Sequence, residues 1–107
     1  MANKSETSRR ILAIHAHPDD LEMTAGGTLI LLAARGHHIT MVTMAPGDCG
    51  TAEMGPEEIS AVRRKEAANA AAVIGAEYQC AEFRDLAIFN DDASRRRVVE
   101  LVRRTRP

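Results

Sequence analysis

Short apolar runs alternate with longer helical patterns along this chain. Residues 11–14 are continuously apolar, and residues 39–44 are mostly β-branched or apolar. Runs of this length and composition indicate strands of a parallel sheet, and the first reads as a strand buried on both faces. The sequence therefore predicts strands within residues 11–16 and 39–44, and a third at 78–83.

Helical patterns follow the first two predicted strands. Residues 24–35 are apolar on almost every side, which predicts a well-covered helix that ends before Gly36. A second helix is predicted from Pro56, a residue type favoured at the first position of a helix, to Gly75. Strand and helix thus alternate, as they do in folds built around a parallel sheet.

A third helix is predicted after a loop at residues 84–90. Asp91 or Asp92 can accept hydrogen bonds from the free N–H groups at its start. Its inward stripe is predicted to consist of Val98, Leu101 and Val102. Three strand-helix units with right-handed crossovers predict an α/β, Rossmann-like, three-layer αβα fold with a parallel sheet, truncated before the fourth strand.

Length narrows the class of protein. With 107 residues the chain is one domain at most, and it is smaller than an ordinary complete α/β enzyme. Residues 1–10 are polar and predict a flexible tail, so residues 11–107 are interpreted as the N-terminal part of a single larger domain. The chain begins with neither a signal-peptide pattern nor a membrane span, so we expect a cytoplasmic protein.

Charge and aromatic content argue against polyanionic partners. The 14 basic and 15 acidic residues nearly cancel, and the chain has one Tyr, two Phe and no Trp. We therefore expect neither a nucleic acid nor an anionic membrane as a partner, because a strong positive field and a platform for stacked bases are both absent from the sequence. Cys49 and Cys80 lack the spacing of a zinc knuckle or redox pair and are predicted to be free thiols.

One motif contains side chains suited to metal binding and acid–base catalysis. It is the tetrapeptide His17-Pro18-Asp19-Asp20, directly after the first predicted strand. Ligands collect at the carboxyl ends of strands in open parallel sheets, and proline restricts the turn. His17 and Asp20 can point to one side of such a turn while Asp19 points elsewhere. This pattern favours a site where His17 and Asp20 bind zinc or another divalent metal and Asp19 is the general base. The alternative is an aspartate that caps the following helix beside a solvated histidine.

Other polar residues have simpler interpretations. His15 shares a strand face with His17, but a buried or hydrogen-bonded strand histidine is favoured over a metal ligand. His37 and His38 are expected to cap the end of the first helix. Arg63 and Glu66 suit a surface ion pair, although Glu66 falls on a stripe that would partly bury it. That stripe comprises Ile59, Val62, Ala70 and Val73.

Several segments together resemble one protein family. The segment Ala16-His17-Pro18-Asp19-Asp20, with Glu22 and Gly26-Gly27-Thr28-Leu29 after it, resembles the opening motif of the LmbE-like, or PIG-L, family of zinc-dependent de-N-acetylases. Residues 43–50 resemble the family's loop after its second strand, and Arg63-Arg64-Lys65-Glu66 resembles its RxxE helix. Phe83-Arg84-Asp85 resembles the segment whose Asp contacts the sugar. Leu21 stands where many members have Glu, a variant associated with bacterial LmbE-like proteins.

The resemblance implies a hydrolase that removes the acetyl group from an N-acetylated amino sugar, its conjugate or a related amide. His17 and Asp20 would then bind Zn²⁺, or another divalent metal, and Asp19 would be the general base. Arg63 and Asp85 would contact substrate hydroxyls or nearby polar groups.

The resemblance also indicates what these residues do not supply. Family members take a third zinc ligand and a general acid, both His, from beyond the fourth strand, so we expect the 107-residue chain to be inactive alone. The alternative is a non-catalytic Rossmann-like module that binds a metal or small ligand. Because the last predicted strand lacks its neighbour, self-association or poor stability of the 107-residue chain is also predicted, and a homo-oligomer is expected.

Overall fold

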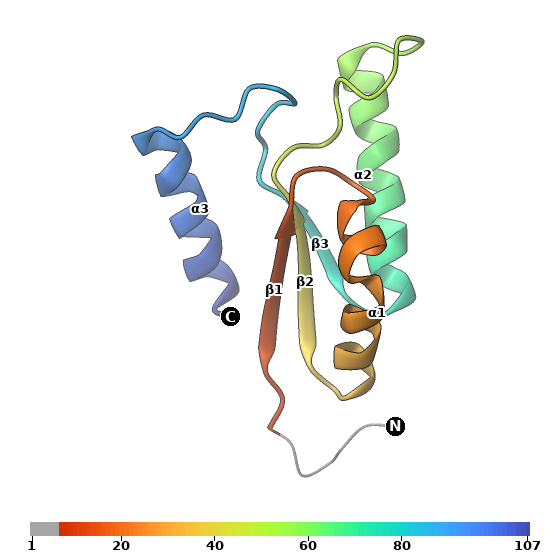
Figure 1. The fold of residues 1–107 in the computed structure, drawn as a ribbon, viewed down its shortest axis with the longest axis vertical. Helices are drawn as coiled ribbons and strands as arrows, with labels where there is room; N and C mark the ends of the chain where they lie inside the picture. Colours follow the sequence, from red (N-terminus) through yellow and green to blue (C-terminus); the bar gives the residue numbers. More distant parts are fainter. Residues whose placement is uncertain (1–6) are drawn as a thin grey trace.

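The computed structural model describes residues 7–107 and contains a three-stranded parallel sheet between two layers of helices (Figure 1). Strands β1 (Arg10–His15), β2 (His38–Thr43) and β3 (Glu77–Cys80) lie in the order β1-β2-β3. Ile11 pairs with Ile39, and Met41 pairs with Tyr78, so β2 is the central strand. All three strands end at the same edge of the sheet.

The helices lie on both faces of the sheet. Helices α1 (Asp20–Ala34) and α2 (Pro56–Val73) cover one face, and α3 (Asp92–Thr105) lies on the other (Figure 1). The predicted α/β, three-layer architecture with a parallel sheet is therefore confirmed. No helix within residues 7–107 combines the length and apolar composition needed to cross a membrane.

The central strand supplies side chains to two cores. Ile39 and Met41 pack with Leu21 and Leu29 between the sheet and the α1/α2 layer. On the other face, Val42 joins a cluster that also contains Ala45, Ala81, Phe83 and Leu101. Alternate residues of β2 thus point to opposite helical layers, as the pleat of a strand requires. Burying both faces holds the carboxyl end of β2 in place.

The first strand agrees only in part with its prediction. Alternate residues of the segment 11–14 pack against the two cores, so both faces of β1 are covered as predicted, but these residues are only partly buried, and full burial on both faces is found in β2. The reason is strand order, because β1 lies at the edge of the sheet among the described residues. Residues 1–6 of the predicted tail lie outside the described residues. Arg10 belongs to β1, and the Ser8 hydroxyl donates a hydrogen bond to Gly36 O at 2.8 Å.

Helix α1 begins at Asp20 instead of Thr24, and it is less covered than predicted. Leu21 and Leu29 are buried, but Met23 is 83% exposed, Leu31 65% and Ile30 55%. Only one side of α1 packs on the sheet, and none of the residues from 7 to 107 covers its outer side. The apolar composition of this helix therefore does not translate into burial on every side.

The other helices depart from their predicted stripes in smaller ways. In α2 the buried positions are Ile59, Ala67 and Ala71, while Val62 and Val73 are exposed, as is Glu66. In α3 Leu101 is buried and Val98 partly so, but Val102 is exposed. Asp91 caps α3, because its Oδ1 accepts a hydrogen bond from Ser94 N at 2.8 Å. Strand β3 ends earlier than predicted, because the chain turns at Glu82, where φ is 68°.

Candidate metal and catalytic site

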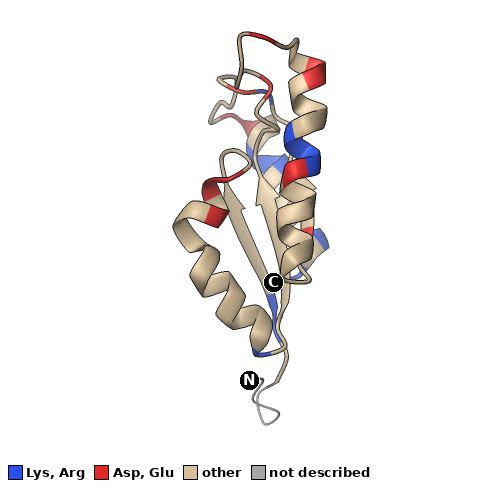
Figure 2. Ribbon diagram, turned by 90° about the vertical axis from the view of Figure 1, so that its right-hand side faces the viewer, with Lys and Arg blue, Asp and Glu red and all other residues tan. Residues whose placement is uncertain are grey.

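Each strand leads into a loop at the same edge of the sheet (Figure 1). Residues 16–19 join β1 to α1, residues 44–55 join β2 to α2, and residues 81–91 join β3 to α3. Acidic residues occur in these loops and at the start of α1 (Figure 2). The carboxyl edge of a parallel sheet is the usual ligand-binding edge, so these loops form the candidate site.

His17 and Asp20 lie side by side in the first loop. Asp20 is the first residue of α1, and its Oδ2 accepts a hydrogen bond from His17 N at 2.8 Å. The imidazole Nδ1 of His17 lies 3.7 Å from the same oxygen. Pro18, which is fully buried, fixes the chain between them. The turn therefore presents one imidazole nitrogen and one carboxylate oxygen at the same point.

Asp19 has a different environment. Its backbone is in the left-handed region, with φ 82°, and its side chain is 63% exposed. Arg63 Nη2 donates to Asp19 Oδ2 at 3.2 Å and to the carbonyl oxygen of Pro18 at 2.7 Å. Asp19 occupies the N-cap position of α1, yet its side chain makes no capping hydrogen bond. The carboxylate thus remains accessible, and the capping alternative does not describe it.

Asp85 joins the second and third loops. Its side chain is buried, with Oδ1 accepting a hydrogen bond from Gly47 N at 3.1 Å and Oδ2 accepting one from Cys49 N at 2.9 Å. In return, Asp48 Oδ1 accepts a hydrogen bond from Asp85 N at 2.7 Å. We call this reciprocal arrangement of Gly47, Asp48, Cys49 and Asp85 the loop clasp. It holds residues 47–49 against the segment that follows β3.

The loop clasp stabilises the ionised form of Asp48. The backbone N–H of Asp85 lowers the pKa of the Asp48 carboxyl, and burial opposes that effect. Arg84 Nε lies 3.5 Å from Asp48 Oδ2 and acts in the same direction as the backbone N–H. A buried carboxylate is tolerated here because hydrogen-bond donors and a cation surround it.

The first loop and the loop clasp meet at His17. His17 Nε2 lies 3.5 Å from Asp85 Oδ1, while Nδ1 faces Asp20. Zinc binds imidazole nitrogen and carboxylate oxygen at about 2.0–2.2 Å, which puts two ligand atoms of one ion roughly 3–3.5 Å apart. The 3.7 Å between His17 Nδ1 and Asp20 Oδ2 is close to that separation. The pair therefore fits a divalent metal.

A second group of possible ligand atoms lies in the loop clasp itself. One ligand atom from each of Asp48, Cys49 and Asp85 falls within 4.8 Å of the others. Both Asp85 oxygens and Asp48 Oδ1 accept backbone hydrogen bonds, but so does Asp20 Oδ2. The two groups differ in exposure, because the side chains of His17 and Asp20 are 42% and 30% exposed, whereas Asp48 and Asp85 are buried. We favour His17 and Asp20 as the ligand pair because an ion can reach them from solvent. Asp48 is not among the residues predicted from the sequence, although its place in a Gly-containing loop directly after a predicted strand is a signal that points to it.

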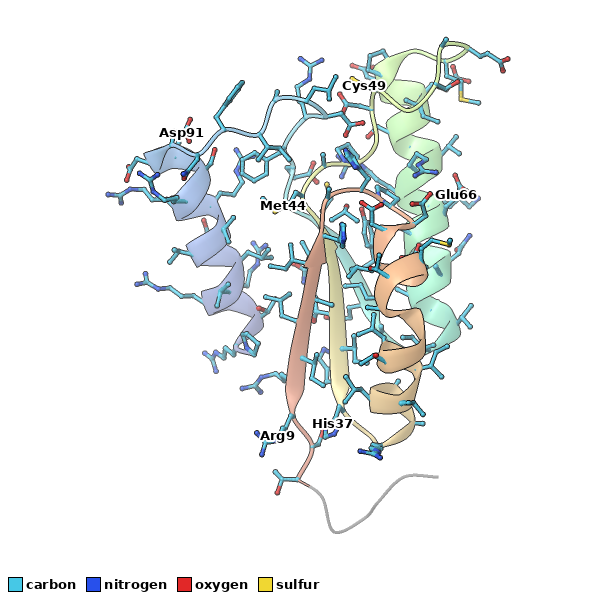
Figure 3. The ribbon with its side chains drawn as sticks, viewed as in Figure 1. Arg9, His37, Met44, Cys49, Glu66 and Asp91 are labelled. Atoms are coloured by element: carbon cyan, nitrogen blue, oxygen red, sulfur yellow. The ribbon has the colours of Figure 1, made fainter. Side chains whose placement is uncertain are left out.

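Of the remaining histidines, His15 adjoins the candidate site, whereas His37 and His38 do not. His15 Nδ1 accepts a hydrogen bond from Ala16 N at 2.8 Å, which confirms a hydrogen-bonded strand histidine, and also lies 3.1 Å from Asp20 Oδ2. His37 Nδ1 accepts one from Arg9 N at 3.1 Å, and His38 Nε2 lies 3.5 Å from Glu77. Figure 3 labels His37 at the end of the sheet opposite Cys49, so this pair lies away from the candidate site.

Comparison with known proteins gives a family match and related enzymes. Residues 12–107 match the family description "PIG-L: GlcNAc-PI de-N-acetylase". A Thermomonospora curvata protein named 1D-myo-inositol 2-acetamido-2-deoxy-alpha-D-glucopyranoside deacetylase is 47% identical over 55 residues, which is 51% of this chain and 18% of that relative. The chain therefore spans less than a fifth of this curated relative.

Two solved structures have the same fold. The N,N'-diacetylchitobiose deacetylase of Pyrococcus horikoshii superposes with a TM-score of 0.86 at 27% identity, covering 96% of this chain and 39% of that one. The 4-carboxy-2-hydroxymuconate hydratase of Pseudomonas putida KT2440 gives a TM-score of 0.82 at 27% identity, covering 92% of this chain and 44% of that one. A deacetylase and a hydratase thus share this architecture.

Proposed function

The chain belongs to the PIG-L family, described as GlcNAc-PI de-N-acetylases, and from that membership we propose that its strand-end site hydrolyses the acetamide of an N-acetylated amino sugar or a conjugate of one. The observation that carries the proposal is that one turn holds His17 and Asp20 side by side, at a separation that suits two ligands of one ion, together with the accessible carboxylate of Asp19. We refer to His17 and Asp20 as the metal-binding pair. In metal-dependent amide hydrolysis the metal makes water a stronger acid, and a nearby carboxylate removes its proton.

His17 and Asp20 are the side chains that would hold the metal. One imidazole and one carboxylate suit Zn²⁺ better than Mg²⁺ or Ca²⁺, which prefer oxygen ligands alone. When bound, a zinc ion supplies Lewis acidity to the amide carbonyl and makes water a stronger acid. Because catalytic zinc usually has three protein ligands, we propose that the third ligand comes from outside the described residues.

Asp19 is proposed as the general base. Its carboxylate accepts the proton of the attacking water, and Arg63 holds Oδ2 through a 3.2 Å hydrogen bond. Arg63 also binds Pro18 O at 2.7 Å, so one guanidinium fixes both the turn and the base. We propose that the acid that protonates the leaving amine also comes from outside the described residues.

An open cavity of about 750 Å³ adjoins the loop clasp at Asp48, and Glu57, Arg64 and Glu82 are among its other lining residues. Its lining does not include His17, Asp19 or Asp20, so the cavity lies beside the proposed catalytic turn. We propose that it receives polar parts of the substrate distant from the acetamide, because charged walls suit hydroxyl groups. Arg63 and Asp85 remain proposed contacts to such polar groups.

The test is Asp19→Asn in the protein at its full natural length. Asn keeps the size of the side chain and tolerates a left-handed backbone, so the turn and the metal-binding pair should persist. We expect acetate release from N-acetylglucosamine conjugates to fall by about 10²–10⁴-fold while zinc content is unchanged.

Two further variants complete the test. Asp92→Asn removes an exposed carboxylate at the start of α3 and should leave acetate release unchanged. His17→Ala should lose zinc together with activity. Full activity of Asp19→Asn would remove Asp19 as the base, and full zinc content in His17→Ala would remove His17 as a ligand. Zinc binding without acetate release by the wild-type protein would favour the non-catalytic module.

A second candidate is hydratase activity. It is favoured by the superposition on the Pseudomonas putida hydratase, which covers 92% of this chain. Both reactions need an activated water, but a hydratase adds it to a carbon–carbon double bond and releases no acetate. Loss of the ultraviolet absorbance of a conjugated carboxylate substrate, without acetate release from amino sugars, would select this candidate.

A further inference from the structure

The Asp85 side chain is buried, and its contacts within the protein suggest a role besides contact with substrate. Its carboxylate is 6% exposed, and each of its oxygens accepts a backbone hydrogen bond. A neutral Asn would satisfy only one of these two N–H donors, because its other terminal atom is itself a donor. The loop clasp therefore requires a carboxylate at this position.

The same carboxylate faces the metal-binding pair. Asp85 Oδ1 lies 3.5 Å from His17 Nε2, whereas Asp20 Oδ2 lies 3.7 Å from His17 Nδ1. The imidazole thus stands between two carboxylates, one at each nitrogen. Only Asp20 belongs to the same turn as His17, so Asp85 ties the ring to a different part of the fold.

Packing alone does not fix the ring. The His17 side chain is 42% exposed, so much of its surface contacts solvent. A histidine ligand normally donates its other N–H to a carboxylate or carbonyl, which fixes the tautomer and the orientation of the ring. Asp85 is the acidic group placed at that nitrogen.

We propose that Asp85 is a positioning residue that orients His17 as a metal ligand, with Nε2–H toward Asp85 and Nδ1 toward the metal. The proposal rests on the metal-binding pair of the proposed function. It gives the loop clasp a role in metal affinity, because the oxygen that binds Gly47 N also faces the ring.

The experiment measures zinc affinity by competition with a chromophoric chelator, in the protein at its full natural length. Asp85→Ala should weaken zinc binding by about 10–100-fold, the usual effect of losing the partner of a histidine ligand. The absorption spectrum of the Co²⁺-loaded protein should also change, because it reports the geometry of the ligands. Neither readout requires catalysis.

The matched control is Asp48→Ala. This variant removes the acceptor of the 2.7 Å hydrogen bond from Asp85 N, and so weakens the loop clasp, but leaves the Asp85 carboxylate beside His17. We expect zinc affinity within about 3-fold of wild type, well below the usual effect of losing the partner itself. Equal losses in the two variants would mean that Asp85 acts only by holding the loops, and the proposal would be wrong.

Three further outcomes are distinguishable. If Asp85→Ala fails to fold, Asp85→Asn takes its place. The amide oxygen of Asn carries no full negative charge and accepts the Nε2–H more weakly, so we expect a smaller loss of zinc affinity, and wild-type zinc affinity together with a wild-type Co²⁺ spectrum would overturn the proposal. A raised KM with unchanged zinc affinity would leave Asp85 as a substrate contact alone and would overturn its role in positioning His17. If the wild-type protein binds zinc but releases no acetate, the proposed function fails, while the difference in zinc affinity still tests Asp85.

Discussion

The loop after β2 changes direction at Gly47. Its φ of 83° lies in the left-handed region, and a Cβ there would lie 3.3 Å from Arg63 Nε. Its N–H donates to Asp85 Oδ1, so a single small residue adjoins both the loop clasp and the arginine that holds Asp19. A side chain at this position would disturb two parts of the site at once.

We expect Gly47→Ala to lower the free energy of unfolding by about 1–2 kcal/mol, the cost of a left-handed backbone for a residue with a Cβ. Urea denaturation measures this change. Gly27→Ala is the control, because Gly27 lies in α1 with open space around its Cα, and should raise stability by about 0.5–1 kcal/mol. If the free energy of unfolding changed with the same sign in both variants, the left-handed backbone would not explain the requirement for glycine at position 47.

The sequence predicts local geometry better than it predicts distant partners. His17 and Asp20 meet because they are three residues apart across a proline turn, which spacing alone can indicate. Asp48 was not identified, because its partner is the backbone N–H of Asp85, 37 residues away. The left-handed conformation of Asp19 likewise depends on how the turn enters α1, and no side-chain pattern encodes it.

Helix α2 and helix α3 are both tied to the segment after β3. Arg64 donates to both carboxylate oxygens of Glu82, at 2.6 and 2.7 Å. From α3, Arg97 donates to Glu82 O at 3.0 Å and lies 4.5 Å from the centre of the Phe83 ring. Residues 81–83 are therefore held between helices on opposite faces of the sheet.

This link predicts an acid-sensitive stability. The hydrogen bond from Arg64 lowers the pKa of Glu82 below its ordinary value of 4.5. A carboxyl whose pKa is lower in the folded state contributes stability above its unfolded pKa, and this stability is lost as the pH falls toward the folded pKa. We expect the melting temperature to fall below about pH 4.5, and less steeply in Glu82→Gln. Glu100→Gln, at an exposed position in α3, should keep the wild-type slope; if Glu82→Gln keeps it too, the link is unimportant.

The sequence predicts where helices occur, but it does not predict correctly which side of each helix is buried. Pro56 and Asp91 mark helix starts because their chemistry acts locally. The buried side of α2 was misassigned because alanine fills much of its second half, and alanine suits a buried or an exposed position equally well. The predicted start of α1 at Thr24 is four residues late, because aspartate is common in turns and the pattern therefore assigns Asp20 to the turn.

Several large apolar side chains on the helices are exposed, although helices cover both faces of the sheet. Met23, Ile30 and Leu31 project from the uncovered side of α1, and Val73 of α2 lines the same shallow depression as Ile30. Alternation of strands and helices was sufficient to predict three layers. It could not indicate which helix sides would remain uncovered, since composition does not specify what packs against them.

This surface predicts self-association of the 107-residue chain. We expect sedimentation to show a concentration-dependent dimer, with α1 of one copy against α1 of another. Leu31→Lys should weaken association by at least about 10-fold, because burying a leucine contributes about 1.5–3 kcal/mol. Val99→Lys, on the exposed side of α3, is the matched control and should leave association unchanged. A monomer at all concentrations would contradict the prediction.

The backbone at Asp19 constrains how this protein can change over generations. A φ of 82° favours Asp, Asn and Gly, and Asn and Gly codons each differ from Asp codons by one base. Mutation therefore has short routes that remove the carboxylate and keep the turn. In lineages where the reaction no longer matters, drift should take those routes first. Their descendants would retain a folded protein with His17 and Asp20 in place and lack only the group proposed to accept the proton.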